Sequence, residues 1–91
     1  MSSNRIIIDV RNPLEYASGH VEGALNIPAN DLISGASSLE NLDRETELVV
    51  YCRSGNRSNA FIQILKQKGF TNLVNGINEE YVKEISPIIN T

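Results

Sequence analysis

The strongest constraint on the fold is the segment Glu47–Tyr51, in which four apolar residues follow one another without interruption. A run that is apolar on both alternating faces is typical of a strand in the middle of a parallel sheet. Because such a strand is covered on both sides, the rest of the chain must supply neighbouring strands and helices that pack on either face.

The other segments provide this alternation of strands and helices. Three consecutive isoleucines, 6–8, favour a buried strand because β-branched side chains fit a pleated surface. Asn12 and Pro13 are typical of a helix start, as an N-cap and a first helical residue. The predicted elements are a strand over 5–10, a helix from 13 that ends at Gly19, a strand over 24–27, a weakly helical stretch over 30–42, the strand over 47–51, a helix over 59–68, a strand over 71–75 and a helix over 79–85.

This order predicts an α/β fold with a mostly parallel sheet of about four strands, flanked by helices on both faces. At 91 residues the chain is short enough to form one domain over 1–91. Ligands of such sheets bind outside the carboxyl ends of the strands. Cys52 stands at that end of the most apolar strand.

Charge and hydropathy argue against two classes of partner. The formal net charge is -3 and no run of basic residues occurs, so nucleic acid is not expected as a partner. The isoleucines near the N-terminus are far too few for a signal-peptide core or a membrane span. We therefore expect a cytoplasmic protein with no membrane partner. The alternative is a periplasmic mature form whose signal peptide has been removed.

The chain contains one cysteine and one histidine. A single cysteine excludes an internal disulfide, a Cys-x-x-Cys redox pair and a cysteine-cluster zinc site. With only one histidine as well, an ordinary zinc ligand set would need several carboxylates. We therefore predict no metal site and no cofactor.

The chemistry concentrates in the loop Cys52-Arg53-Ser54-Gly55-Asn56-Arg57-Ser58. A strand leads to Cys52 and a helix is expected to begin near Ser58, so the backbone between them must curl. Gly55 can take the positive φ that such a curl needs, and successive N–H groups then face the thiol. The helix N-terminus and the two arginines add positive charge. Each of these features favours a thiolate over a thiol, and the same groups could hold an oxyanion beside the sulfur.

This loop resembles the active-site loop of single-domain rhodaneses, written there as Cys, two residues, Gly, one residue, Arg, Ser. Further fragments follow in the family's order and cover nearly the whole chain. The resemblance implies a rhodanese-like fold of the compact, phage-shock type, without the first strand of larger rhodaneses because Asp9 comes so early. These fragments are Asp9-Val10-Arg11, Glu15-Tyr16, Gly19-His20-Val21, Gly23-Ala24 and Asn26-Ile27-Pro28.

The resemblance also implies residue roles. Cys52 would be the nucleophile of a thiosulfate sulfurtransferase and would carry a persulfide. The backbone N–H groups of residues 53–58 would surround its terminal sulfur. Arg57 would bind the sulfonate of thiosulfate, with Arg53 at the rim, and the Ser58 hydroxyl would donate toward the Cys52 sulfur. The acceptor would be cyanide or a thiol, and a sulfur-relay protein is a possible partner.

Other residues of the resemblance are interpreted as structural. Asp9 and Arg11 would tie the first strand to neighbouring loops, and His20 would lie in a turn rather than act as a base. One departure from the family pattern stands out. Relatives usually carry Gly-Gly and then Trp after the final strand, whereas this chain has Asn75-Gly76-Ile77 and later Tyr81.

Two other functions compete with the sulfurtransferase. A persulfide carrier or protein-binding module in a sulfur relay would use the same loop. A cysteine phosphatase or arsenate reductase also combines Cys with Arg, but it places the Arg one residue later than the four-residue gap between Cys52 and Arg57. A phosphatase also needs an acid for its alkoxide leaving group, usually an Asp. We rank the phosphatase or reductase lowest.

Overall fold

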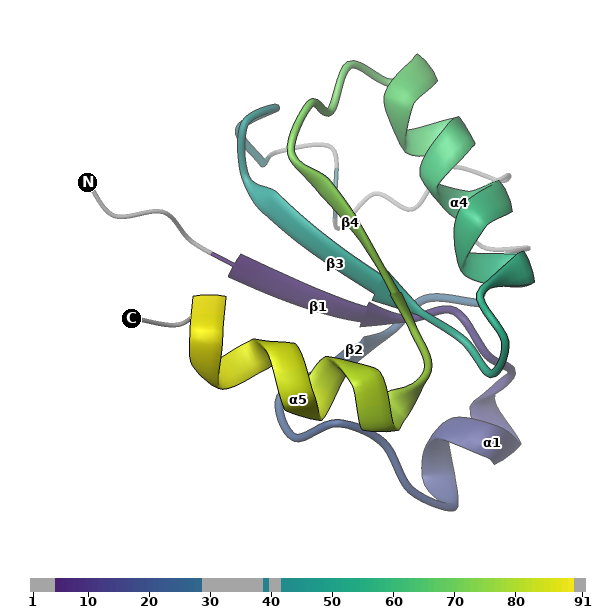
Figure 1. Cartoon of the computed structure of the whole chain (residues 1–91). Coiled ribbons are helices and arrows are strands. Elements are labelled where there is room, and N and C mark those ends of the chain that lie inside the picture. The colour runs from purple at the N-terminus through teal and green to yellow at the C-terminus, as the bar shows by residue number, and fades with distance from the viewer. Residues whose placement is uncertain (1–4, 29–38, 40–41, 90–91) are drawn as a thin grey trace.

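The computed structural model describes residues 5–28, 39 and 42–89, and these residues form a four-stranded, fully parallel sheet (Figure 1). The strand order is β2-β1-β3-β4, so the apolar strand β3 lies inside the sheet between β1 and β4. The predicted α/β fold with about four strands is confirmed. The strands are β1 (Arg5–Asp9), β2 (Leu25–Asn26), β3 (Glu47–Tyr51) and β4 (Leu73–Ile77).

Two long helices cover opposite faces of the sheet, α4 (Asn56–Gln67) and α5 (Glu79–Ile89) (Figure 1). Because side chains alternate along a strand, the apolar run of β3 is shared between them. Val50 belongs to the core cluster under α4, and Val49 to the one under α5. The buried cluster under α4 comprises Ile8, Val10, Ile27, Leu39, Leu48, Val50, Cys52, Phe61, Ile62, Leu65 and Phe70. The buried cluster under α5 comprises Val21, Ala24, Val49, Tyr51 and Val82.

The short helix α1 (Pro13–Ala17) begins where the sequence predicts. Asn12 is its N-cap, and the Asn12 side chain accepts a hydrogen bond of 2.9 Å from the N–H of Glu15. The Glu15 carboxylate in turn accepts a hydrogen bond of 3.1 Å from the N–H of Asn12. This capping box fixes the position of the Glu15 side chain as well as the start of the helix.

Several boundaries differ from the prediction. Helix α4 begins at Asn56 rather than 59, because Gly55 adopts φ 94° and turns the chain directly into the helix. Strand β4 covers 73–77 rather than 71–75, since Thr71 still bonds to Arg44 and a register shift after Val50 lets Ile77 pair with Tyr51. Strand β2 is shorter than predicted and α5 extends further. The predicted weakly helical stretch over 30–42 lies largely outside the described residues.

Parallel pairing brings the carboxyl ends of all four strands to one edge of the sheet. Cys52 follows β3 at this edge, and Arg11 and Asn78 follow β1 and β4. Asn26, at the end of β2, donates from its side chain to the carbonyl oxygens of Asp9 and Arg11, at 3.0 and 2.9 Å. These hydrogen bonds therefore join the ends of β1 and β2 to one another.

Gly76 allows α5 to lie close to the sheet. A Cβ at this position would lie 2.5 Å from Cγ2 of Val82 and 3.2 Å from Cγ1 of Val49. We expect Gly76→Ala to lower the free energy of unfolding by about 1–3 kcal/mol through overpacking, measured by urea denaturation. In Gly76→Ala/Val82→Ala the clash is removed, so the double variant should be clearly more stable than the sum of the two single losses implies. Additive losses would show that the helix moves aside freely.

Candidate active site

Cys52 is one of the residues that line an open pocket of about 240 Å³ at the carboxyl edge of the sheet. Only 2% of the Cys52 surface is exposed, yet the residue is part of the pocket wall. Cys52 is therefore almost fully enclosed and borders the pocket. The wall consists of Arg11, Cys52, Arg53, Asn78, Glu79 and Glu80.

Two backbone N–H groups of the loop donate to the sulfur, from among the residues 53–58 that the sequence predicts to surround it. The N–H of Gly55 donates to Sγ of Cys52 at 3.2 Å, and the N–H of Ser58 donates at 3.4 Å. Ser58 is the third residue of α4, where backbone N–H groups have no partner within the helix. Because the helix begins at Asn56, its first turn itself forms one side of the sulfur site.

These contacts decide the protonation of the thiol. Burial raises the pKa of Cys52 and is the largest single effect, since it disfavours a charged sulfur. Hydrogen bonds from the N–H and hydroxyl of Ser58 and from the N–H groups of Ser54 and Gly55 act the other way and together exceed it. The resulting pKa of Cys52 is about 7, so a large share of the protein holds a thiolate at neutral pH.

The Ser58 hydroxyl, predicted to donate toward the sulfur, here donates to Asn75 and to the carbonyl oxygen of Gly55 and accepts from the neutral thiol of Cys52. Its oxygen lies 3.7 Å from Sγ of Cys52 and 2.7 Å from Oδ1 of Asn75. The same Asn75 oxygen accepts from the N–H of Ile77 at 2.9 Å, and the Asn75 amide donates to the carbonyl of Gly55 at 3.3 Å. Asn75, a departure from the family pattern, thus connects the sulfur site to β4.

Both loop arginines contact one carboxylate. Glu15 Oε1 lies 3.1 Å from Nη1 of Arg57, and Glu15 Oε2 lies 3.3 Å from Nη2 of Arg57 and 3.5 Å from Nη1 of Arg53. The hydrogen bond to Arg57 is the main reason that the pKa of Glu15 is lowered, so Glu15 is ionised near neutral pH. Arg53 is one of the described residues that line the pocket, whereas Arg57 is not.

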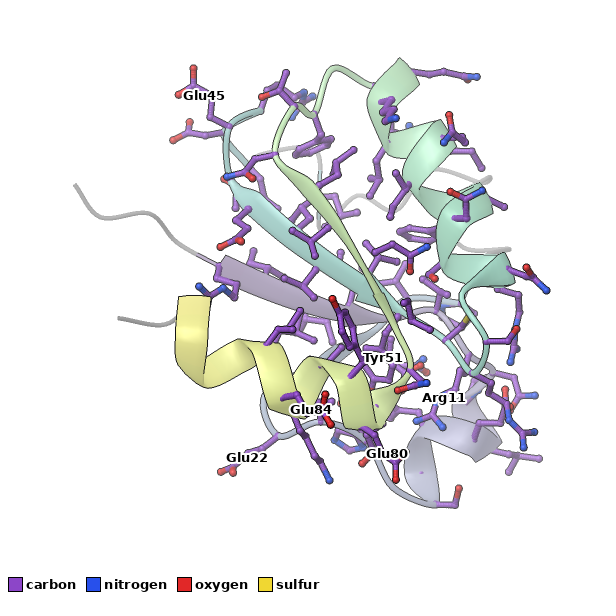
Figure 2. The ribbon with its side chains drawn as sticks, in the orientation of Figure 1. Arg11, Glu22, Glu45, Tyr51, Glu80 and Glu84 are labelled. Carbon is purple, nitrogen blue, oxygen red and sulfur yellow. The ribbon has the colours of Figure 1, made fainter. Side chains whose placement is uncertain are left out.

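Arg11, which Figure 2 places near Tyr51 at one end of the sheet, is held by the buried carboxylate of Asp9. Asp9 is fully buried and accepts from the backbone N–H, Nε and Nη2 of Arg11, at 2.9, 3.0 and 2.7 Å. The hydroxyl of Tyr51 donates to Asp9 at 2.9 Å and accepts from the N–H of Val21 at 3.0 Å. Burial raises the pKa of Tyr51 to about 12, so this hydroxyl keeps its proton. The network joins β1, β3 and the loop before β2.

The residues found at the site differ in part from those that the sequence predicts. Sequence analysis placed Asp9 and Arg11 as ties between loops, and they do connect these loops, but Arg11 also forms part of the pocket wall. The side chains of Ser54 and Asn56 are exposed, and Ser54 acts on the thiol through its backbone. Sequence analysis assigned no site role to five residues: Glu15, Asn75, Asn78, Glu79 and Glu80. Two of them carried a signal in the sequence: Glu15 belongs to a fragment of the family resemblance, and Asn75 departs from the family pattern.

His20 lies in the turn after α1. Its ring stacks on that of Tyr16 with centroids 3.6 Å apart, and its Nδ1 is 2.8 Å from the carbonyl oxygen of Tyr16. These contacts are within the turn, in keeping with the structural role expected for His20. Among the described residues, no three His, Cys, Asp or Glu side chains gather as a metal site would require. None of the described helices is both long and apolar enough to span a bilayer.

A comparison with known protein families identifies the family of this chain. The family model described as a rhodanese-like domain matches residues 1–82. The chain belongs to the rhodanese-like domain family. The same fold is seen in a solved structure titled "rhodanese with anions from E. coli", with a TM-score of 0.74. The two chains are 31% identical, and the alignment covers 85% of this chain and 89% of the other.

Named relatives of this rhodanese-like domain include enzymes and a carrier. Thiosulfate sulfurtransferase PspE of Escherichia coli is 35% identical over 75% of this chain and 64% of its own length. "Putative sulfur carrier protein YrkF" of Bacillus subtilis is 33% identical over 76% of this chain and 36% of its own length. The chain thus spans less than two thirds of each of these curated relatives.

Reactivity of Cys52 should follow its lowered pKa. The thiolate is the nucleophile, so the rate of alkylation by iodoacetamide should rise with pH, with a midpoint near 7 rather than at the ~8.5 of free cysteine. Ser58→Ala removes one hydrogen bond to the sulfur and should move the midpoint upward. Ser54→Ala is the matched control, because it keeps the backbone N–H and should leave the midpoint near 7. A wild-type midpoint at the free-cysteine value would disprove the role of the loop.

Proposed function

We propose that this rhodanese-like domain is a sulfurtransferase that takes a sulfane sulfur from thiosulfate or a persulfide donor and carries it on Cys52. The observation that supports this most directly is the environment of the sulfur: two backbone N–H groups donate to it at 3.2 and 3.4 Å, and Cys52 lines an open pocket. These fixed dipoles stabilise negative charge on sulfur without reorganisation during the reaction.

The first step is a displacement on sulfur. The Cys52 thiolate attacks the outer sulfur of thiosulfate, a new S–S bond forms, and the old S–S bond breaks with its electron pair leaving on sulfite. Sulfite is a stable anion, so the step needs no general acid. In the second step the acceptor, a thiol or cyanide, attacks the terminal sulfur of the persulfide and the Cys52 thiolate is released. The enzyme thus works by double displacement with a covalent intermediate.

The lone cysteine requires an external acceptor. With a single Cys in the chain, no second thiol can attack the persulfide to form an internal disulfide. The persulfide therefore remains in the pocket until an acceptor enters. The same property suits a carrier that passes sulfur to a protein, and the similarity to YrkF supports this second candidate.

Transfer to Cys52 can be measured by mass. After incubation with thiosulfate, we expect the intact wild-type protein to gain the mass of one sulfur atom, and cyanide or a thiol should remove it. Cys52→Ser should show no gain, because its hydroxyl is not ionised near neutral pH. Turnover with small acceptors would favour the enzyme, and loading without turnover would favour the carrier. Absence of any mass gain from thiosulfate or a persulfide donor would refute both.

Arg57 should contribute to the binding of an oxyanion donor. Its charge acts on the site, since the charge of Cys52 is among the lesser causes that raise the pKa of Arg57. We expect Arg57→Ala to raise KM for thiosulfate by about tenfold with a smaller effect on kcat, measured by sulfite release. Lys66→Ala is the matched control, since it removes the same charge from the last turn of α4. If the two variants have equal KM, the sulfonate binds elsewhere.

A further inference from the structure

Among the residues that the structure describes, Glu15 is the only acidic residue that forms an ion pair with either loop arginine. Its carboxylate contacts both terminal nitrogens of Arg57, at 3.1 and 3.3 Å, and reaches Arg53 at 3.5 Å. Two parallel contacts of this kind are the favoured geometry for a guanidinium and a carboxylate. The capping box holds Glu15 in this position, because Oε1 also accepts from the N–H of Asn12 at 3.1 Å.

The charges around the sulfur are therefore nearly balanced. Three guanidinium groups stand at the site, those of Arg11, Arg53 and Arg57. Arg11 is paired with Asp9 at 2.7 Å, and the two loop arginines share Glu15. Three positive and two negative charges leave a single excess positive charge, and one Cys52 thiolate cancels it. An incoming dianion thus meets little net positive charge.

Two further carboxylates contribute negative charge at the pocket. Glu79 and Glu80 line it, from the first turn of α5. Glu79 is paired with Lys83 at 3.2 Å, which leaves Glu80 as a further negative charge at the pocket. Figure 2 shows Glu80 and Arg11 near one another at the end of the sheet where the pocket lies.

We propose that Glu15 is a specificity-determining residue that weakens the attraction of the loop arginines for anions and so reduces the preference of the site for dianionic over monoanionic sulfur donors. A sulfonate must share Arg57 with this carboxylate or displace it. As far as sulfur donors are concerned, the inference rests on the proposed function. The effect of Glu15 on anions reaching Cys52 does not depend on it.

The first test compares two donors that differ by one charge. Thiosulfate is a dianion, and methanethiosulfonate offers the same sulfur on a sulfonyl group as a monoanion. Glu15→Gln removes the charge and keeps an oxygen that can accept from the N–H of Asn12, so the capping box can persist. We expect KM for thiosulfate to fall by about threefold to tenfold in this variant. The fall for methanethiosulfonate should be about the square root of that factor, because the interaction scales with charge.

The second test needs no sulfur transfer. Iodoacetate and iodoacetamide alkylate the same thiolate and differ mainly in charge. The rate with iodoacetamide corrects for any change in the fraction of thiolate. We expect Glu15→Gln to raise the ratio of the iodoacetate rate to the iodoacetamide rate by about threefold. Added salt should then lower this ratio more steeply in the variant than in the wild type.

Glu45→Gln is the control for net charge. Glu45 is exposed and lies at the opposite end of the sheet from Arg11 (Figure 2). It should leave both the donor preference and the alkylation ratio unchanged. An unchanged or lower alkylation ratio in folded Glu15→Gln, verified by its melting temperature, would overturn the proposal for Glu15. A raised ratio without any sulfur loading would instead support Glu15 as an anion filter and reject the proposed function.

Discussion

The arrangement of the carboxyl edge of the sheet depends on the hydrogen bonds of the buried Asp9 carboxylate. Asp9 ends β1, binds Arg11 and accepts from the hydroxyl of Tyr51 at the end of β3. Tyr51 in turn receives the N–H of Val21, so the loop before β2 is part of the same network. An unpaired charge at this fully buried position would cost several kcal/mol, whereas four donating groups on two residues keep it satisfied. Arg11, which lines the pocket, is thus held in place by a carboxylate that does not itself line the pocket.

The position of Cys52 affects the pKa of its thiol in two opposite directions. Its place at the end of the most buried strand removes it from water, which raises its pKa. The same place puts it at the first turn of α4, where N–H groups of the backbone are free to donate. The hydrogen bonds exceed the burial effect, and a pKa of about 7 results. A thiolate with this pKa is both populated at neutral pH and still strongly nucleophilic.

The arginines at the site are compensated rather than free. Asp9 balances Arg11 from within the core, and Glu15 balances Arg53 and Arg57 from the surface. A fully uncompensated cluster would bind any small anion, which would block the thiolate. In the proposed sulfur transfer, this near balance of charge would let sulfite leave instead of being held by the arginines.

The sequence alone determined the alternation of strands and helices, the position of Cys52 at a strand end and the family, because hydrophobic periodicity, turn residues and a loop motif are local properties. It misjudged the start of α4 by three residues, since only the φ of 94° at Gly55 shows that the helix begins within the loop. Tertiary structure alone decided which side chains surround the sulfur. Glu15 and Arg57 are 42 residues apart, and Ser58 and Asn75 are 17 apart, so their contacts follow from how β4 and α1 pack beside the loop. The identity of a residue limits what it can bind, but the distance to its partner is set by the packing of the whole chain.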